Sequence, residues 1–391
     1  MREVRSRTQK ADMDRANVLI VGGGVVGCAV AEGLSRRWTD VFLVEKNPKL
    51  GMATSSRNSG VIHSGIYYPK GSWKAKLCVA GNRLTKEFCL RHGVAHRTTG
   101  KLVVAQDAGE TAELLALKKK GEDNGVTGLR LIDAAEIRRQ EPHVQGHAAL
   151  EVPSTGICSA EELVHAFARV AQGQGANLVN HATVVRMEPR KDSVRVTLRI
   201  GDKEKSEEET IEARCVVNSA GLYADEVAGM LGPRPWKIYP VRGEYCEIRG
   251  ARAELIRNLV YPLPHHDQLT LGVHFTKTLW GTTLVGPTAR YVDGKENYER
   301  GRLSIAEFAA DAKTMLPEIE ERDLQLGYTG LRPKLKAPGE KGIADFVIEA
   351  DREVPRVIQL VGIESPGLTA AAAIAGRVGE LVGEVLVNTN R

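Results

Sequence analysis

The feature that most constrains this chain is a glycine-rich turn that joins an aliphatic segment to a helical one near the N-terminus. Residues 18–21 are all aliphatic, Gly22-Gly-Gly24-Val-Val-Gly27 follows, and residues 28–37 have helical spacing. An all-aliphatic strand is typical of a parallel sheet covered on both faces, and a helix that joins two such strands forms a right-handed βαβ unit. Glycines at these spacings allow a sharp turn, the approach of backbone to a pyrophosphate, and close packing of helix on strand. The segment therefore predicts a dinucleotide-binding domain.

Glu45 supports this interpretation, because it follows the next apolar run, residues 41–44. An acidic side chain roughly 20 residues beyond such a turn accepts hydrogen bonds from ribose hydroxyl groups. The turn alone does not separate nicotinamide from flavin enzymes. Two later segments, 218–221 and 364–369, also end strands in small residues. Contacts dispersed in this way favour a large two-headed cofactor such as FAD.

Composition excludes several other classes of protein. The chain is 42% apolar and 26% charged with a net charge of +5, which is typical of a globular protein with its own core. Basic residues are interspersed with acidic ones and aromatic residues are only 5%, so no nucleic-acid partner is expected. The six cysteines form no Cys-x-x-Cys pair, so neither a metal site nor a redox dithiol is predicted.

The expected location is the cytoplasm, or the mitochondrion for a eukaryotic source. Residues 1–15 have no apolar core of the kind that a secretory signal contains. No apolar stretch is long enough to cross a bilayer, whereas peripheral contact with the inner membrane surface stays open.

The order of elements predicts an α/β protein with two domains. Residues 16–90, 151–236 and 326–391 are expected to form a discontinuous, Rossmann-like domain around a central parallel sheet. Residues 91–150 and 237–325 contain strands broken by Gly, Pro and His and no nucleotide signature. They predict a second, α+β domain with a mainly antiparallel sheet, where the substrate would bind.

The chain resembles the FAD-dependent L-2-hydroxyglutarate dehydrogenase/oxidase family, a branch of the D-amino-acid-oxidase-like flavoproteins. The resemblance is carried by residues 55–68, 74–81, 220–225, 240–245, 261–264, 271–276 and 330–334, and it covers most of the chain. Gly362-Ile-Glu-Ser-Pro-Gly-Leu-Thr369 matches one form of the family, whereas other members have Asn-Ala-Pro-Ser-Pro-Ala there. The resemblance implies oxidation of (S)-2-hydroxyglutarate to 2-oxoglutarate, with FAD passing electrons to a quinone, another carrier or dioxygen.

The same resemblance implies which residues hold FAD. They are Gly22, Gly24, Gly27, Glu45, Lys46, Ser56, Arg57, Asn58, Ser59, Gly60, Ala220, Gly221, Gly367, Leu368 and Thr369. Related flavoproteins clamp the adenine with main-chain groups at the position of Val185. Arg57 has an alternative role as a solvated surface cation.

Two histidines are candidates for the catalytic base. His63 lies in the loop that the family places against the flavin ring, and His274 lies on a predicted strand of the substrate domain. An imidazole with a pKa near 6.5 can take a hydroxyl proton near neutral pH. A structural role is the alternative for either residue, and we expect one of the two to be the base.

Recognition of a dicarboxylate requires cations, because buried carboxylates need charged partners. Arg242 and Arg332 lie beside Gly or Pro at predicted strand ends, and a guanidinium can bind a carboxylate through two hydrogen bonds. Tyr261 is a further candidate donor. The alternatives are surface ion pairing for the arginines and, for the protein, an amino-acid oxidase, a glycerol-3-phosphate-type dehydrogenase, or a non-catalytic nucleotide-binding regulator.

Overall fold

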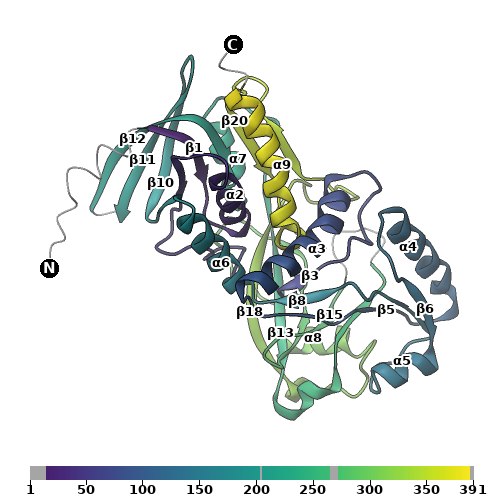
Figure 1. Cartoon of the computed structure of the whole chain (residues 1–391). Coiled ribbons are helices and arrows are strands. Elements are labelled where there is room, and N and C mark those ends of the chain that lie inside the picture. Colours follow the sequence, from purple (N-terminus) through teal and green to yellow (C-terminus); the bar gives the residue numbers. More distant parts are fainter. Residues whose placement is uncertain (1–14, 203–204, 265–271, 388–391) are drawn as a thin grey trace.

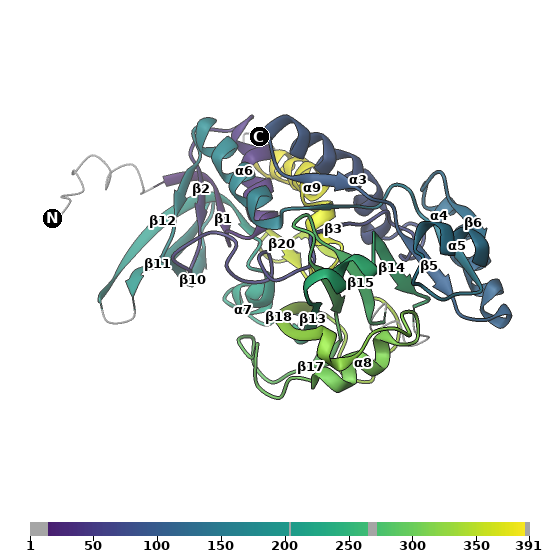
Figure 2. The ribbon, with the colours of Figure 1, turned by 90° about the horizontal axis from the view of Figure 1, so that it is seen from below.

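The chain builds two large β-sheets, with the two halves of the molecule lying side by side (Figures 1 and 2). The computed structural model describes residues 15–202, 205–264 and 272–387. A small sheet of β3 (Val61–Ile62), β8 (Gly156–Cys158) and β4 (His96–Thr98) adds to the two large ones.

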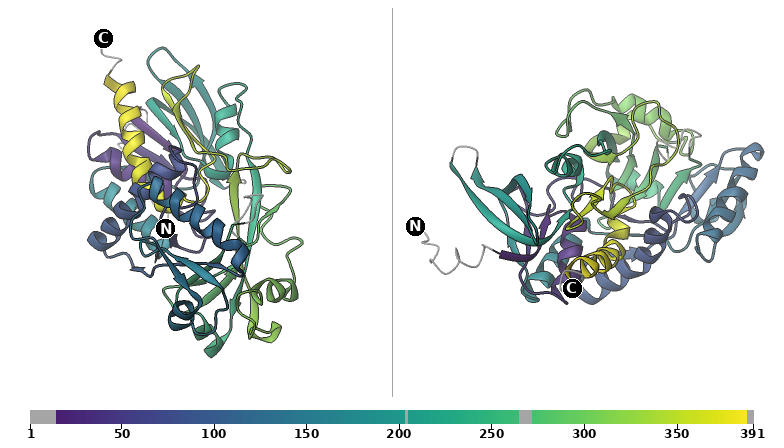
Figure 3. Two further views of the ribbon diagram at one scale, coloured as in Figure 1. Left: turned by 90° about the vertical axis from the view of Figure 1, so that its right-hand side faces the viewer. Right: turned by 90° about the horizontal axis from the view of Figure 1, so that it is seen from above.

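The first sheet contains the predicted nucleotide-binding unit. Its strands are β1 (Arg15–Val21), β2 (Val41–Val44), β9 (Asn177–Val179), β10 (Ala182–Pro189), β11 (Val194–Asp202), β12 (Lys205–Asn218), β19 (Val347–Ala350) and β20 (Val357–Val361). β9, β2, β1, β12 and β20 are parallel neighbours, while β10, β11 and β19 add antiparallel strands. The β10–β12 sheet extends away from the body of the molecule (Figure 3). The predicted parallel sheet is thus present.

Helices cover this sheet with apolar side chains. They are α2 (Val25–Ser35), α3 (Trp73–His92), α6 (Ala160–Gly173), α7 (Ala224–Gly229) and α9 (Gly367–Val387). The helix expected from residue 28 already begins at Val25, because Gly24 is its N-cap and the glycine turn runs directly into it. None of the helices in the described part of the chain combines the length and apolar character needed to cross a bilayer.

The second sheet is mainly antiparallel, as expected. Its strands are β5 (Leu102–Ala105), β6 (Arg130–Asp133), β7 (Ala148–Glu151), β13 (Tyr239–Ile248), β14 (Leu259–Pro262), β15 (His274–Lys277), β16 (Thr283–Gly286), β17 (Arg290–Tyr291) and β18 (Leu324–Lys334). The helices α4 (Thr111–Asp123), α5 (Ala134–Gln140) and α8 (Ile305–Ala312) belong to this half, and short 3₁₀ helices lie at Ala108–Glu110, Gly221–Tyr223, Gly250–Leu255 and Glu321–Asp323. The boundary predicted at residue 326 falls inside β18, which pairs with β13 in this sheet.

Close contact between α3 and α9 fixes the start of the C-terminal helix. The two helices lie side by side in Figures 1 and 3. A Cβ atom added at Gly81 of α3 would lie 2.2 Å from the carbonyl oxygen of Thr369 and 2.8 Å from Cα of Ala370. Only a glycine lets the two backbones approach so closely, and this approach places the first turn of α9 beside the loop that follows β3.

We predict that Gly81→Ala lowers the free energy of unfolding by about 1–3 kcal/mol, the usual cost of an overpacked core. Gly376→Ala in α9 is the matched control, because an added Cβ meets nothing within 4 Å there. The control should be neutral or stabilising by up to about 1 kcal/mol, since alanine favours helix more than glycine does. Equilibrium denaturant unfolding measures both, and a Gly81→Ala variant as stable as the wild type would contradict this packing.

Candidate active site

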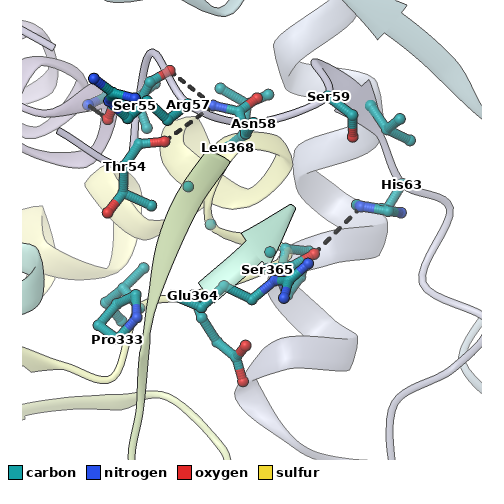
Figure 4. A pocket seen from close by; sticks show the side chains of 18 of the residues that line it. Thr54, Ser55, Arg57, Asn58, Ser59, His63, Pro333, Glu364, Ser365 and Leu368 are labelled. Atoms are coloured by element: carbon teal, nitrogen blue, oxygen red, sulfur yellow. Dashed lines mark hydrogen bonds between the residues drawn. The ribbon is translucent and has the colours of Figure 1, made fainter. Parts of the chain in front are cut away.

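A cavity of about 260 Å³ lies where the two halves of the chain meet, and Figure 4 shows part of its lining. It is lined by the glycine turn, the loop after β2, strands β13, β14, β15 and β18, and the segment that leads into α9. Parallel strands of an α/β sheet bind ligands beyond their carboxyl ends. The cavity lies at the carboxyl end of β1, as this rule requires.

The glycine turn leaves the N-terminus of α2 open to a ligand. Gly22 has φ +104°, and an added Cβ at Gly27 would lie 1.9 Å from the carbonyl oxygen of Gly22. Gly24 lines the cavity and, as N-cap, has no side chain to cap the helix, while the N–H of Val25 donates to Oγ of Ser55 at 2.9 Å. A helix N-terminus suits an anionic group such as a pyrophosphate.

Glu45 is fixed beside this turn by backbone donors. Its Oε2 accepts a hydrogen bond of 2.7 Å from Gly23 N, and its Oε1 accepts one of 2.8 Å from Asn47 N. Lys46 turns elsewhere: its Nζ lies 3.5 Å from the centroid of the Tyr223 ring and 3.6 Å from Oε1 of Glu296. The Glu45 carboxylate is thus fixed beside the glycine turn, whereas the side chain of Lys46 contacts the Tyr223 ring.

The loop after β2 is shaped by Asn58. Its Nδ2 donates to the carbonyl oxygens of Thr54 and Ser55, and its Oδ1 accepts from Gly60 N (Figure 4). Arg57, Asn58 and Ser59 line the cavity, together with Thr54 and Ser55, which sequence reasoning missed. The guanidinium of Arg57 lies 4.3 Å from the centroid of the Tyr298 ring, so it is held against protein rather than solvated.

Only some of the other residues predicted to contact FAD line the cavity. Gly221, Gly367 and Leu368 line the cavity, while Ser56, Gly60, Ala220 and Val185 do not. Ser56 donates to Ala53 O. Val185 lies at a register shift in β10, between the pairs Val184–Leu198 and Arg186–Thr197. That shift leaves Val185 outside the β10–β11 pairing, so its main-chain groups suit the predicted adenine contact.

The side chain of Thr369 joins two distant segments of the chain. Its buried Oγ1 accepts a hydrogen bond of 2.9 Å from His63 N and donates to the carbonyl oxygen of Val61 at 3.3 Å. The threonine side chain therefore fixes the loop that carries His63. This link spans 306 residues of sequence, so no local pattern indicates it.

Both candidate histidines line the cavity. Nε2 of His63 lies 3.3 Å from Oγ of Ser365 (Figure 4), while its buried Nδ1 has no hydrogen-bond partner among the described residues. Nδ1 of His274 lies 2.7 Å from Gly272 O, so it carries the proton and leaves Nε2 as the basic nitrogen. The His274 ring stacks on Tyr261 with centroids 3.7 Å apart.

Burial makes both imidazoles neutral at physiological pH. Desolvation, assisted by the charge of Lys101, lowers the pKa of His63 to about 3. Desolvation also lowers the pKa of His274 to about 3, and the nearby charge of Lys101 acts in the same direction. Each histidine is therefore present in the form that can accept a proton.

The two candidate arginines differ. Arg332 lines the cavity, where its Nη1 donates to Thr288 O at 3.2 Å. Arg242 does not line it, and its five N–H groups are directed at protein acceptors. These acceptors are Oε1 of Glu244, Oδ1 of Asn297 and the carbonyl oxygens of Arg300 and Gly301. The prediction that Arg242 binds substrate is corrected on this ground, because no donor remains for a ligand.

A buried ion cluster in the cavity was missed at the sequence level. Lys74 Nζ lies 2.9 Å from Oε1 of Glu364, and Lys334 Nζ lies 3.6 Å from its Oε2. Burial alone would raise the pKa of Glu364, but the two ammonium charges hold it below its ordinary value. One signal was available, since Glu364 falls in the segment where this sequence departs from other members of the family it resembles.

The residues present fit FAD. The N-terminus of α2 faces the cavity at Gly24, the carboxylate of Glu45 is bound to the glycine turn, and glycines occur where side chains would collide with backbone. No group of three or more His, Cys, Asp or Glu side chains that could hold a metal ion occurs among the described residues.

Comparison with known proteins agrees with this geometry. Residues 17–381 match the DAO family, described as FAD dependent oxidoreductase. The mitochondrial L-2-hydroxyglutarate dehydrogenase of Arabidopsis thaliana is 33% identical over 93% of this chain and 83% of its own length. The L-2-hydroxyglutarate dehydrogenase of Escherichia coli (strain K12) is 30% identical over 95% of this chain and 94% of its own.

Solved structures share the fold. The FAD-bound L-alpha-glycerophosphate oxidase of Mycoplasma pneumoniae superposes with a TM-score of 0.84 at 27% identity, covering 95% of both chains. The glycine oxidase of Geobacillus kaustophilus gives 0.78 at 20% identity over 95% of both chains. The expected resemblance, the α/β fold class and the FAD cofactor are confirmed. The chain belongs to the DAO family of FAD-dependent oxidoreductases.

Proposed function

We propose that this protein oxidises (S)-2-hydroxyglutarate, which is L-2-hydroxyglutarate, to 2-oxoglutarate. The observation that carries the proposal is a cationic cavity in which two neutral histidines and Arg332 meet. Arg57, Lys74, Arg332 and Lys334 line it against a single carboxylate, Glu364. A surplus of cations suits a substrate with two carboxylates. Relatives named for this activity match the chain over nearly its whole length.

FAD supplies a two-electron hydride acceptor when it is bound. Gly24, Gly221 and Leu368 are the cavity residues that we assign to holding it, with Glu45 at the ribose and main-chain groups of Val185 at the adenine.

The histidines hold and move the proton. In the proposed step the O–H bond of the substrate breaks and its proton passes to a ring nitrogen of His63 or to Nε2 of His274. The hydrogen on C2 leaves with its electron pair, and the C2–O bond becomes a carbonyl. Arg332, with Tyr261 as an additional donor, orients a substrate carboxylate.

The electron acceptor is a quinone, another carrier or dioxygen in this proposal. A dye-reduction assay run beside peroxide detection separates a dehydrogenase from an oxidase. A quinone would place the protein in peripheral contact with a membrane. The location in this proposal is the cytoplasm, or the mitochondrion for a eukaryotic source, and the mitochondrial relative supports the latter.

Glycerol 3-phosphate is the second candidate substrate, because the M. pneumoniae glycerophosphate oxidase is similar in structure. We predict that L-2-hydroxyglutarate bleaches the flavin absorbance of the holoenzyme under anaerobic conditions, whereas glycerol 3-phosphate and the D-enantiomer do not. Bleaching by glycerol 3-phosphate alone would replace the proposed substrate. The absence of bleaching by any hydroxy or amino acid would favour a non-catalytic binding protein.

Replacing the base should slow the chemical step. We predict that His63→Ala or His274→Ala lowers the rate of anaerobic flavin reduction by at least about 100-fold, the lower end of general-base contributions. His143→Ala is the control, because His143 is exposed and contacts Glu318 away from the cavity. Unchanged rates in both cavity variants would rule out a histidine base.

Replacing Arg332 should affect binding more than chemistry. A hydrogen bond to a charged group contributes about 1.5–3 kcal/mol, so Arg332→Ala should raise KM for 2-hydroxyglutarate roughly 10- to 100-fold. The matched substrate is 2-hydroxypentanoate, which lacks the second carboxylate. Steady-state kinetics with both compounds test the role, and equal increases in KM would show that Arg332 does not recognise the second carboxylate.

A further inference from the structure

Lys101 is a buried cation behind the aromatic wall of the cavity. It immediately precedes β5 and is 2% exposed. Its Nζ donates a 2.9 Å hydrogen bond to Oη of Tyr67 and lies 4.6 Å from the centroid of the Tyr261 ring. Tyr67 and Tyr261 both line the cavity beside the two histidines, so Lys101 is separated from a ligand by one layer of aromatic side chains.

No carboxylate within the described ranges forms an ion pair with Lys101, which distinguishes it from other buried lysines. Lys74 is paired with Glu364, and Lys277 is paired with Glu254. Removing an ammonium group from water without a counter-charge is costly. At the edge of an active site, we expect such an unpaired ammonium group where a bound ligand supplies the missing negative charge.

The hydrogen bond also fixes how Tyr67 can act. A lysine ammonium only donates hydrogen bonds, so the Tyr67 oxygen must be the acceptor. The phenol hydrogen is then directed away from Lys101 and is available to a group in the cavity. Tyr67 becomes a donor with a positive charge behind it.

We propose that Lys101 is a positioning residue for the substrate: through Tyr67 it presents a hydrogen-bond donor and a counter-charge to a substrate carboxylate. This inference rests on the proposed function for the identity of the dicarboxylate. It assigns to Lys101 and Tyr67 a part in substrate recognition that is separate from the part proposed for Arg332.

The groups that face Lys101 allow this role to be measured as a proton uptake. They are Tyr67, Tyr261, Cys78, His63 and His274. Burial lowers the pKa of Lys101 to about 7. Burial raises the pKa of the Cys78 thiol and of the Tyr67 and Tyr261 phenols. It lowers the pKa of each histidine to about 3. Among these groups Lys101 alone changes charge near neutral pH. A nearby carboxylate favours its charged form, so a dicarboxylate that binds above pH 7 should bring a proton with it.

The experiment uses the FAD-loaded protein and glutarate, a dicarboxylate without the hydroxyl group that is oxidised. Isothermal titration calorimetry in two buffers of different ionisation enthalpy gives the protons taken up on binding. We expect the wild type to take up most of a proton at pH 8 and little at pH 6, and to bind glutarate more weakly as the pH rises through 7.

Lys101→Met should abolish the uptake and weaken glutarate binding at pH 6 by about tenfold or more, the lower range for a hydrogen bond to a charged group. Lys86→Met is the matched control, because burial also lowers the pKa of Lys86, yet it donates to Ser154 O and does not line the cavity. Tyr67→Phe removes only the hydroxyl group. Because the two residues act in series, the double variant should bind no more weakly than the weaker single variant.

Several outcomes would overturn the inference. Unchanged proton uptake in Lys101→Met would assign the proton to another group such as Lys334. Strictly additive effects of Lys101→Met and Tyr67→Phe on glutarate binding would show that the two residues do not act in series. The absence of glutarate binding by the wild type would also contradict the inference. The proposed function is tested separately by flavin bleaching with L-2-hydroxyglutarate. If L-2-hydroxyglutarate does not bleach the flavin but Lys101→Met still loses the proton uptake, the proposed substrate is wrong. The role of Lys101 in carboxylate recognition is then still supported.

Discussion

The arrangement of the active site depends on the hydrogen bond between His63 N and Oγ1 of Thr369. This bond joins the loop after β3 to the first turn of the C-terminal helix, and the carbonyl oxygen of Thr369 lies 2.2 Å from where a Cβ at Gly81 would be. Three distant segments of the chain are thereby held at one point. The candidate base, the N-terminus of α9 and the segment with Ser365 can face one cavity only while this contact is intact.

Charge within the cavity is the second constraint. Lys74 and Lys334 are held by Glu364, whereas Arg332 and, behind the tyrosines, Lys101 have no such carboxylate within the described part of the chain. Burial keeps both histidines neutral, and the charge of Lys101 acts in the same direction.

The sequence predicts those parts of the site that depend on local geometry. The glycines at 22, 24 and 27 and the position of Glu45 identify the nucleotide-binding unit, because turn, helix and strand follow one another directly. The roles of Arg242 and Thr369 could not be predicted. Which way Arg242 turns depends on the loop that presents Arg300 O, and the position of Thr369 depends on α3. The cluster of Lys74 and Glu364 joins residues 290 positions apart, and only the folded chain brings them together.

The central claim is that the N-termini of α2 and α9 enclose one FAD molecule. The most direct measurement is the visible spectrum of the purified protein, followed by quantification of the FAD released on heat denaturation. The account predicts a flavin spectrum and FAD in stoichiometric amount, either as purified or after FAD is supplied. A colourless protein that fails to take up FAD would contradict it.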